Sequence, residues 1–78
     1  MSSPLRILEL ESKLAKDDDG SFRDNLCESL NDELRGVKRH IDSGLPPEEF
    51  EQASQYAQAL ETAVEVVERV WRAEHPGA

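Results

Sequence analysis

The sequence is poor in the residue patterns that carry out chemistry. Cys27 is the only cysteine, so no disulfide can form within the chain. The two histidines, His40 and His75, lie far apart, and no serine or cysteine has a suitable base at the spacing of a nucleophile motif. A glycine-rich phosphate loop is also missing. We therefore expect no catalytic residues, no cofactor and no enzymatic activity.

The acidic run from Asp17 to Asp19 lacks the spacing of a calcium loop. An EF-hand loop needs a glutamate six residues after its central glycine, and Leu26 stands at that distance from Gly20. We interpret this run as a solvated turn, and we expect no metal site.

Long apolar runs and clustered basic residues are missing as well. No run approaches the roughly 20 apolar residues of a membrane span, and the start of the sequence shows no cationic and apolar secretory segment. The formal net charge is −8, whereas binding of nucleic acid needs a basic face. Arg35, Lys38 and Arg39 do lie together, at an expected helix end where cations favour the helix dipole. We expect a protein of the reducing cytoplasm with no membrane or nucleic-acid partner.

The sequence does contain apolar residues at helical spacing. It shows no strand signal and no internal repeat. At the sharpest break, Gly44 suits the left-handed residue that closes a helix, and Pro47 suits the first turn of the next helix. We expect an all-α single domain over residues 1–78, with a short helix 5–16, a long helix 21–43, a turn 44–47 and a long helix 47–73. Because the turn is short, the two long helices should form an antiparallel hairpin.

Apolar residues at steps of three and four predict how these helices pack. The last helix carries a first stripe of Phe50, Ala53, Ala57, Leu60, Val64, Val67 and Trp71. It should face a seam on the preceding helix made of Cys27, Leu30, Leu34, Val37 and Ile41. On this seam Cys27 is interpreted as a small buried hydrophobe. The short helix places Leu5, Ile7, Leu8, Leu10 and Leu14 along its apolar side, and Ser21 with Asp24 resembles a capping box at the start of the first long helix.

A second apolar stripe lies about a quarter turn from the first on the last helix. It consists of Tyr56, Ala59, Ala63, Val66 and Val70, and we call it the second stripe throughout. One neighbouring helix cannot cover both stripes. We therefore interpret these five residues as partner-binding, with the small residues Ala59 and Ala63 allowing a partner backbone to approach closely.

The run from Gly44 to Trp71 resembles the C-terminal half of the YscE family of bacterial type III secretion proteins, which includes PscE, AscE, SsaE and EscE. The family pattern is a glycine-containing turn, an aromatic residue early in the last helix, an Ala-Leu-Glu-x-Ala core, paired branched residues and a terminal aromatic. The residues that match are Gly44, Pro47, Phe50, Ala59, Leu60, Glu61, Ala63, Val66, Val67, Val70 and Trp71.

The resemblance implies a co-chaperone of needle assembly in the bacterial cytoplasm. Members of the family bind a small tetratricopeptide (TPR)-like chaperone of the YscG or PscG kind, and the pair keeps the needle subunit monomeric before export. Carried onto this sequence, the chaperone contacts would come from the second stripe, with Tyr56, Val66 and Val70 as the main candidates.

Two other interpretations stay open. The second stripe would also suit a self-associating module that forms a homodimeric four-helix bundle. A helix lying on a membrane surface would need basic residues beside its apolar face. Glu61, Glu65 and Glu68 are expected along the outer side of this helix instead, which disfavours the membrane.

Overall fold

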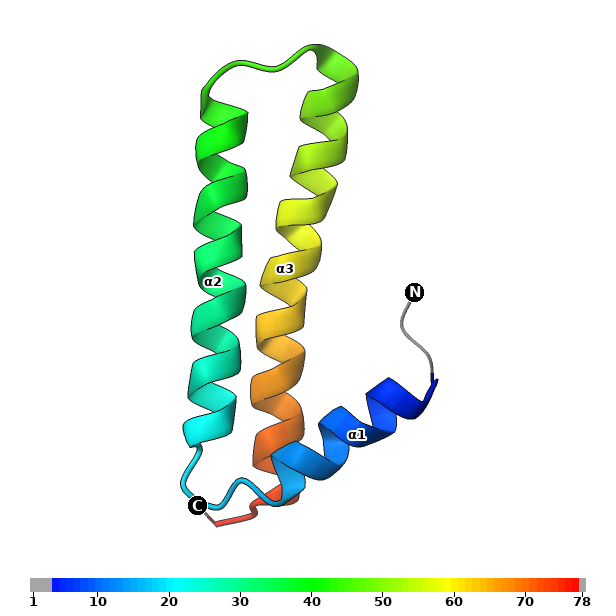
Figure 1. The fold of residues 1–78 in the computed structure, drawn as a ribbon, viewed down its shortest axis with the longest axis vertical. Helices are drawn as coiled ribbons and strands as arrows, with labels where there is room; N and C mark the ends of the chain where they lie inside the picture. Colours follow the sequence, from blue (N-terminus) through cyan, green and yellow to red (C-terminus); the bar gives the residue numbers. More distant parts are fainter. Residues whose placement is uncertain (1–3, 78) are drawn as a thin grey trace.

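The computed structural model describes the backbone of residues 4–77 and the side chains of residues 8–77. It contains three helices: α1 (Pro4–Ala15), α2 (Ser21–Asp42) and α3 (Pro47–Glu74). Figure 1 shows α2 and α3 side by side as an antiparallel hairpin, with α1 crossing its lower end. The molecule is elongated, 45 × 24 × 15 Å. The predicted all-α hairpin with a short N-terminal helix is confirmed, and each helix end lies within one residue of the expected ranges 5–16, 21–43 and 47–73.

The hairpin turn follows the chemistry of its residues. Gly44 has a φ of 88°, in the left-handed region that a side chain disfavours. Its backbone N–H donates to the carbonyl of Ile41 at 3.2 Å, and the hydroxyl of Ser43 donates to the carbonyl of His40 at 2.6 Å. These bonds satisfy carbonyls that the end of α2 would otherwise leave free. Pro47 occupies the first turn of α3, as predicted.

The start of α2 differs from the sequence prediction. Gly20, with a φ of 76°, is the N-cap residue, and no capping box forms between Ser21 and Asp24. The carboxylate of Asp17 instead accepts from the backbone N–H groups of Phe22 and Arg23, at 3.0 and 2.9 Å. Asp17 is only 8 % exposed, so the interpretation of 17–20 as a solvated turn was wrong for this residue. The carboxylate satisfies helix N–H groups that have no partner within the helix.

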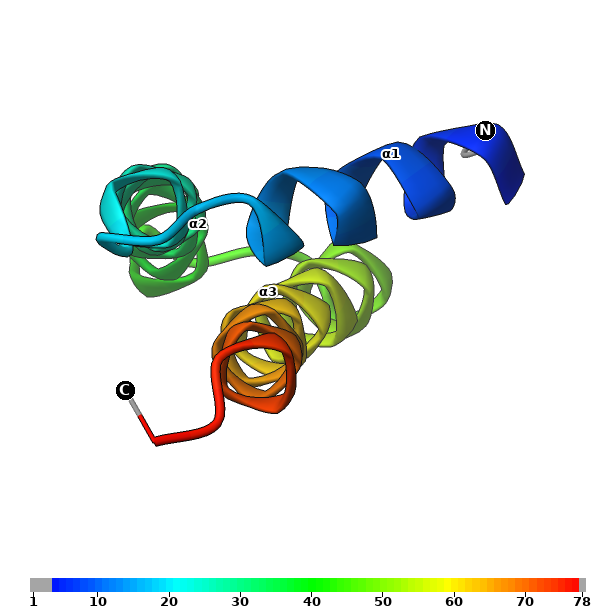
Figure 2. The same ribbon diagram turned by 90° about the horizontal axis from the view of Figure 1, so that it is seen from below.

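The core lies at the lower end of the hairpin, where α1 meets α2 and α3. Leu14 of α1, Val67 and Trp71 are buried together. Phe22, Leu26, Cys27, Leu30 and Val70 pack against this cluster. In the view from below, α1 lies across one side of the two long helices (Figure 2). Leu14 is 1 % exposed, and full burial of a leucine side chain contributes roughly 1.5–3 kcal/mol.

Trp71 links the core to the loop before α2. Its indole Nε1 donates to the carbonyl of Asp17 at 2.8 Å. The guanidinium of Arg23 lies 4.1 Å from the ring centroid of Trp71, and the ring of His75 stacks on it with centroids 4.2 Å apart. A desolvated cation–π contact of this kind contributes about 1–2 kcal/mol. These contacts hold the beginning of α2 against the end of α3.

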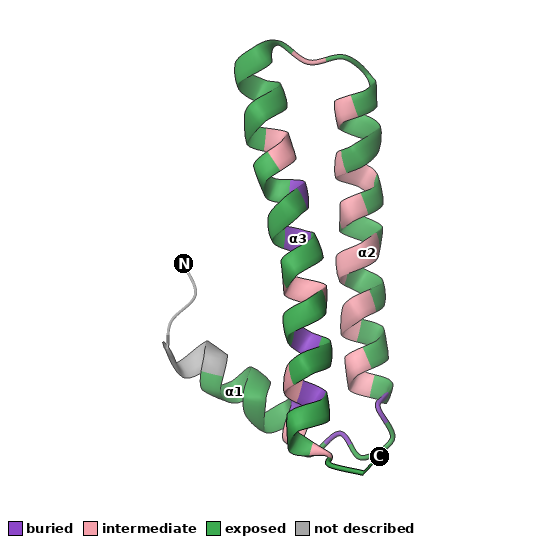
Figure 3. Ribbon diagram, turned by 180° about the vertical axis from the view of Figure 1, so that it is seen from behind, coloured by how far each residue is buried: buried purple, intermediate pink, exposed green. Residues whose placement is uncertain are grey.

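Burial decreases toward the hairpin turn. Figure 3 places the buried positions of α3 mainly in its middle and lower parts, while the described residues of α2 are at most half-buried. On the first stripe, Ala57, Leu60, Val67 and Trp71 are buried, and Ala53 and Val64 are half-buried. Phe50 departs from the prediction, with 48 % of its surface exposed. The side chains of Leu5 and Ile7, which were expected on the apolar side of α1, lie outside the described residues.

Candidate protein-binding surface

The described part of the chain contains neither a metal-binding cluster nor an activated thiol. Residues 8–77 contain no group of three or more histidine, cysteine, aspartate or glutamate side chains that would hold a metal ion. Cys27 is half-buried on the α2 seam, and burial raises the pKa of its thiol, so the nucleophilic thiolate is disfavoured. No described helix is both long enough and apolar enough to cross a membrane.

The second stripe follows one side of α3, but its members differ in exposure. Tyr56 is 47 % exposed and Val66 is 46 % exposed. Ala59 is exposed as well, while Ala63 and Val70 are half-buried. The stripe therefore presents apolar surface to solvent mainly over its first three turns.

Val70 has a second role that the sequence pattern did not reveal. It packs against the buried cluster of Leu14, Val67 and Trp71. A charge at Val70 would therefore disturb the core as well as the surface of the molecule. Val66 lies one turn earlier on α3 and is not part of this cluster. A substitution at Val66 therefore tests the exposed part of the second stripe without disturbing the core.

The exposed part of α1 adds to the apolar surface. Leu8 is 61 % exposed and Leu10 is 36 % exposed, although the sequence pattern placed Leu10 on the packed side of this helix. Figure 1 shows that α1 projects away from the hairpin toward its N-terminus, so only its C-terminal end is seated against the core. Leu14 is seated there, and the residues before it extend beyond α3.

Tyr56 stands at the border between the second stripe and α2. Its hydroxyl donates to Glu33 Oε1 at 2.9 Å. The hydrogen bond to the Glu33 carboxylate raises the pKa of the Tyr56 phenol, and desolvation and the negative charge of Glu33 act in the same direction. The sequence did not pair these residues, because 23 positions separate them and only the hairpin brings them together.

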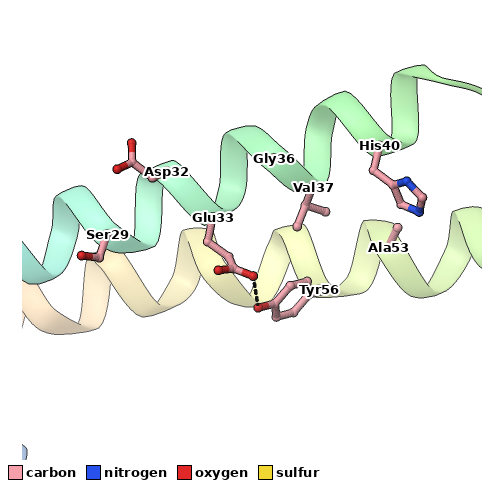
Figure 4. Close-up of a pocket in the computed structure, with 8 residues that line it drawn as sticks. All are labelled: Ser29, Asp32, Glu33, Gly36, Val37, His40, Ala53 and Tyr56. Carbon is pink, nitrogen blue, oxygen red and sulfur yellow. Dashed lines mark hydrogen bonds between the residues drawn. The ribbon is translucent and has the colours of Figure 1, made fainter.

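Next to Tyr56 the structure forms an open groove between α2 and α3, of about 750 Å³. We call it the upper groove. It is lined by Ser29, Asp32, Glu33, Gly36, Val37, His40, Ala53 and Tyr56 (Figure 4). Gly36 lies inside α2, where glycine destabilises a helix by about 1 kcal/mol relative to alanine. In the structure, a Cβ added at Gly36 would meet no described atom closer than Arg39 Nη2, at 4.0 Å, so nothing in the described part of the chain requires glycine there.

Ion pairs occur within the two long helices, between them and at the lower end of the hairpin. Lys38 Nζ lies 3.4 Å from Glu61 Oε1, and this pair joins α2 to α3. Arg72 lies 3.8 Å from Glu68. These side chains are about half exposed or more, so each pair contributes at most about 1 kcal/mol. Beside Val66 and Ala59 the structure places no such pair among the described residues.

Comparison with known proteins gives a family for this arrangement. A family model described as "type III secretion system, cytoplasmic E component of needle" matches residues 7–73. Searches among curated proteins and among solved structures found no match. The matched residues include all of α2 and nearly all of α3, so the resemblance to the YscE family is confirmed, and the expected cytoplasmic location agrees with the family description. The chain belongs to the family of cytoplasmic E components of the type III secretion needle.

Proposed function

We propose that this chain is a co-chaperone of a type III secretion system. It binds and stabilises a TPR-like chaperone of the YscG or PscG kind, and the pair keeps the needle subunit monomeric in the cytoplasm before export. Membership of the needle-component family supports the secretion role. The exposed part of the second stripe, which includes Tyr56 and Val66, is the observation that supports protein binding.

The energetic argument concerns apolar surface that the folded chain leaves in water. Burying a valine side chain completely contributes roughly 1.5–3 kcal/mol, and Val66 keeps 46 % of its surface exposed. Tyr56 is exposed to a similar extent. A partner that covers both side chains removes this apolar surface from water and so adds stabilisation that the isolated hairpin lacks.

The shape of the surface suits a helical partner. Ala59 is exposed and Ala63 is half-buried, and both are small, so a partner backbone can approach α3 closely between Tyr56 and Val66. TPR-like proteins stack helix pairs into an extended concave surface. An amphipathic helix that presents anchors at helical spacing is the kind of ligand that such a surface accepts.

Binding of this kind stabilises both partners by mass action. A ligand that binds only the folded state raises its stability by about 2.7 kcal/mol when its free concentration is one hundred times the dissociation constant. The chaperone gains in the same way from the co-chaperone. It is thereby withdrawn from its unfolded and aggregating pool, and no catalytic step is needed.

The test is the affinity of two charge variants of α3 for the chaperone. Val66→Asp places a carboxylate in the interface, where it would be desolvated, and binding should weaken by about 2 kcal/mol or more. Gln58→Asp adds the same residue on an exposed position of α3 away from the second stripe, and its affinity should match the parent. Isothermal titration gives the affinities, and circular dichroism should show both variants folded, within about 0.5 kcal/mol of the parent.

Two results would overturn the proposal. If Val66→Asp bound the chaperone as tightly as Gln58→Asp, this side of α3 would not be the interface. If the parent instead formed a tight dimer that Val66→Asp dissociates, and did not bind the chaperone, the second stripe would serve self-association.

A further inference from the structure

The side of the hairpin that receives α1 is only partly filled. Leu26 packs with the cluster around Leu14. Ser29, Glu33 and Val37 follow Leu26 at steps of three and four, so they lie on the same side of α2, further along the helix. These three residues line the upper groove. The space between α2 and α3 that seats a helix at its lower end is therefore open at its upper end.

The upper groove has an apolar floor and an acidic wall. Val37 and Ala53 are half-buried at the floor. In Figure 4 their side chains lie between the two helices, and Tyr56 lies over α3 with its hydroxyl toward Glu33. Gly36 presents no side chain, so a docking backbone can come close to α2 there. Asp32 and Glu33 supply the carboxylates of the wall, and His40 stands at the end nearer the turn.

The charges of the groove favour a cationic occupant. Two cations already lie near the groove: Arg35 pairs with Asp32, and Arg39 Nη2 lies 4.0 Å from the position of a Cβ at Gly36. Among the carboxylates that line the groove, Glu33 is the one whose described partner is neutral, the hydroxyl of Tyr56. An ionised carboxylate offers about four acceptor sites, so Glu33 can accept from an incoming lysine or arginine as well. The net charge of −8 adds a general attraction for a basic partner and opposes a second copy of this chain.

We propose that the upper groove binds a short amphipathic helix of another protein, one with small apolar anchors on its inner side and a lysine or arginine facing Glu33. α1 shows how the same side of the hairpin receives a helix. The site is separate from the Val66 region of α3, and it shares only Tyr56 with the second stripe. It would let the chain hold a second helical segment while Ala59, Ala63 and Val66 of the second stripe contact the chaperone.

The test uses synthetic helical peptides as probes of the full chain. One peptide has alanine and leucine on its inner side and lysines beside them, and the other has glutamate in place of each lysine. Gly36→Leu fills the groove without changing the net charge, and Gly36→Ala adds a single carbon. Ser29→Leu blocks the lower end of the groove independently, should Gly36→Leu disturb the fold. Backbone amide chemical shifts report the site, and titration calorimetry reports the affinity.

We expect the lysine peptide to shift the amides of Gly36, Val37 and Ala53. Gly36→Leu and Ser29→Leu should each weaken its binding at least about tenfold, while Gly36→Ala should stay within about twofold of the parent. Val66→Asp should leave peptide binding unchanged, which keeps this test distinct from that of the proposed function. The proposal is overturned if neither peptide binds, if both bind equally, or if the two leucine variants bind like the parent, since that would leave only a diffuse attraction between charges.

Discussion

The phenol of Tyr56 joins the two long helices through its hydrogen bond to Glu33, and its titration reports that contact. The acceptor carboxylate raises the pKa of the phenol above its ordinary value of 10.0. A group whose pKa is raised on folding adds stability that is fully present below the unfolded pKa and is lost as the pH rises through the folded pKa. The contact between Tyr56 and Glu33 should therefore weaken only above about pH 10.

Tyr56 is the only tyrosine of the chain, so the prediction is simple to check. In a spectrophotometric titration of the phenolate, Tyr56 of the folded parent should ionise at higher pH than in the urea-unfolded chain. Glu33→Gln removes the carboxylate and should bring the pKa down toward 10.0. Equal titration curves for the parent and Glu33→Gln would show that the two side chains do not interact in solution.

The beginning of α2 shows how a helix can be started from outside its own sequence. Asp17 lies four residues before Ser21, yet its carboxylate accepts from two backbone N–H groups of the first turn of α2. Loss of such a cap costs about 0.5–2 kcal/mol. We expect Asp17→Ala to lower the free energy of unfolding by about 1–2 kcal/mol, because two N–H groups lose a buried acceptor.

Asp18→Ala is the matched control for this prediction. The side chain of Asp18 is 95 % exposed, and its nearest partner is His75 Nε2 at 3.8 Å. Its removal should change the free energy of unfolding by less than about 0.5 kcal/mol. Urea denaturation followed by circular dichroism measures both variants. Equal losses of stability would mean that charge in this loop, rather than capping by Asp17, stabilises α2.

The elements themselves were predictable, because their signals are local. Seams at steps of three and four, Gly44 and Pro47 specify the hairpin and its turn within a few positions of sequence. The cap at Asp17 was missed because a capping box was assumed, whereas the carboxylate reaches α2 across Gly20, which takes the left-handed conformation. The position of α1 on the hairpin could not be predicted either. An amphipathic pattern shows which side of a helix is apolar, but it does not show where along the neighbouring helices that side packs.

The candidate surface was predictable to the same limited degree. Counting residues on a helix places Tyr56, Ala59, Ala63, Val66 and Val70 on one side of α3, and this much follows from the sequence. Their unequal exposure does not. Val70 is half-covered because it packs on the cluster around Leu14, and Tyr56 turns to Glu33 because the hairpin register brings them together. Contacts between distant parts of the chain decide which members of an apolar stripe remain available.

The chain as a unit has a small core. Among the described residues, the buried apolar side chains are Leu14, Ala57, Leu60, Val67 and Trp71. A domain of 78 residues buries a modest fraction of its surface and is marginally stable without a staple or a partner. The exposed apolar side chains Leu8, Phe50, Tyr56 and Val66 are therefore surface that a partner can use for stabilisation.

Sedimentation equilibrium of the chain alone and mixed with its TPR-like chaperone decides whether that surface serves a different protein. We expect the chain alone to be a monomer of 8.8 kDa, and the mixture to sediment as a single complex. The melting temperature of the complex should rise with chaperone concentration. A tight homodimer of the isolated chain that does not associate with the chaperone would contradict the proposed function and assign the exposed side of α3 to self-association.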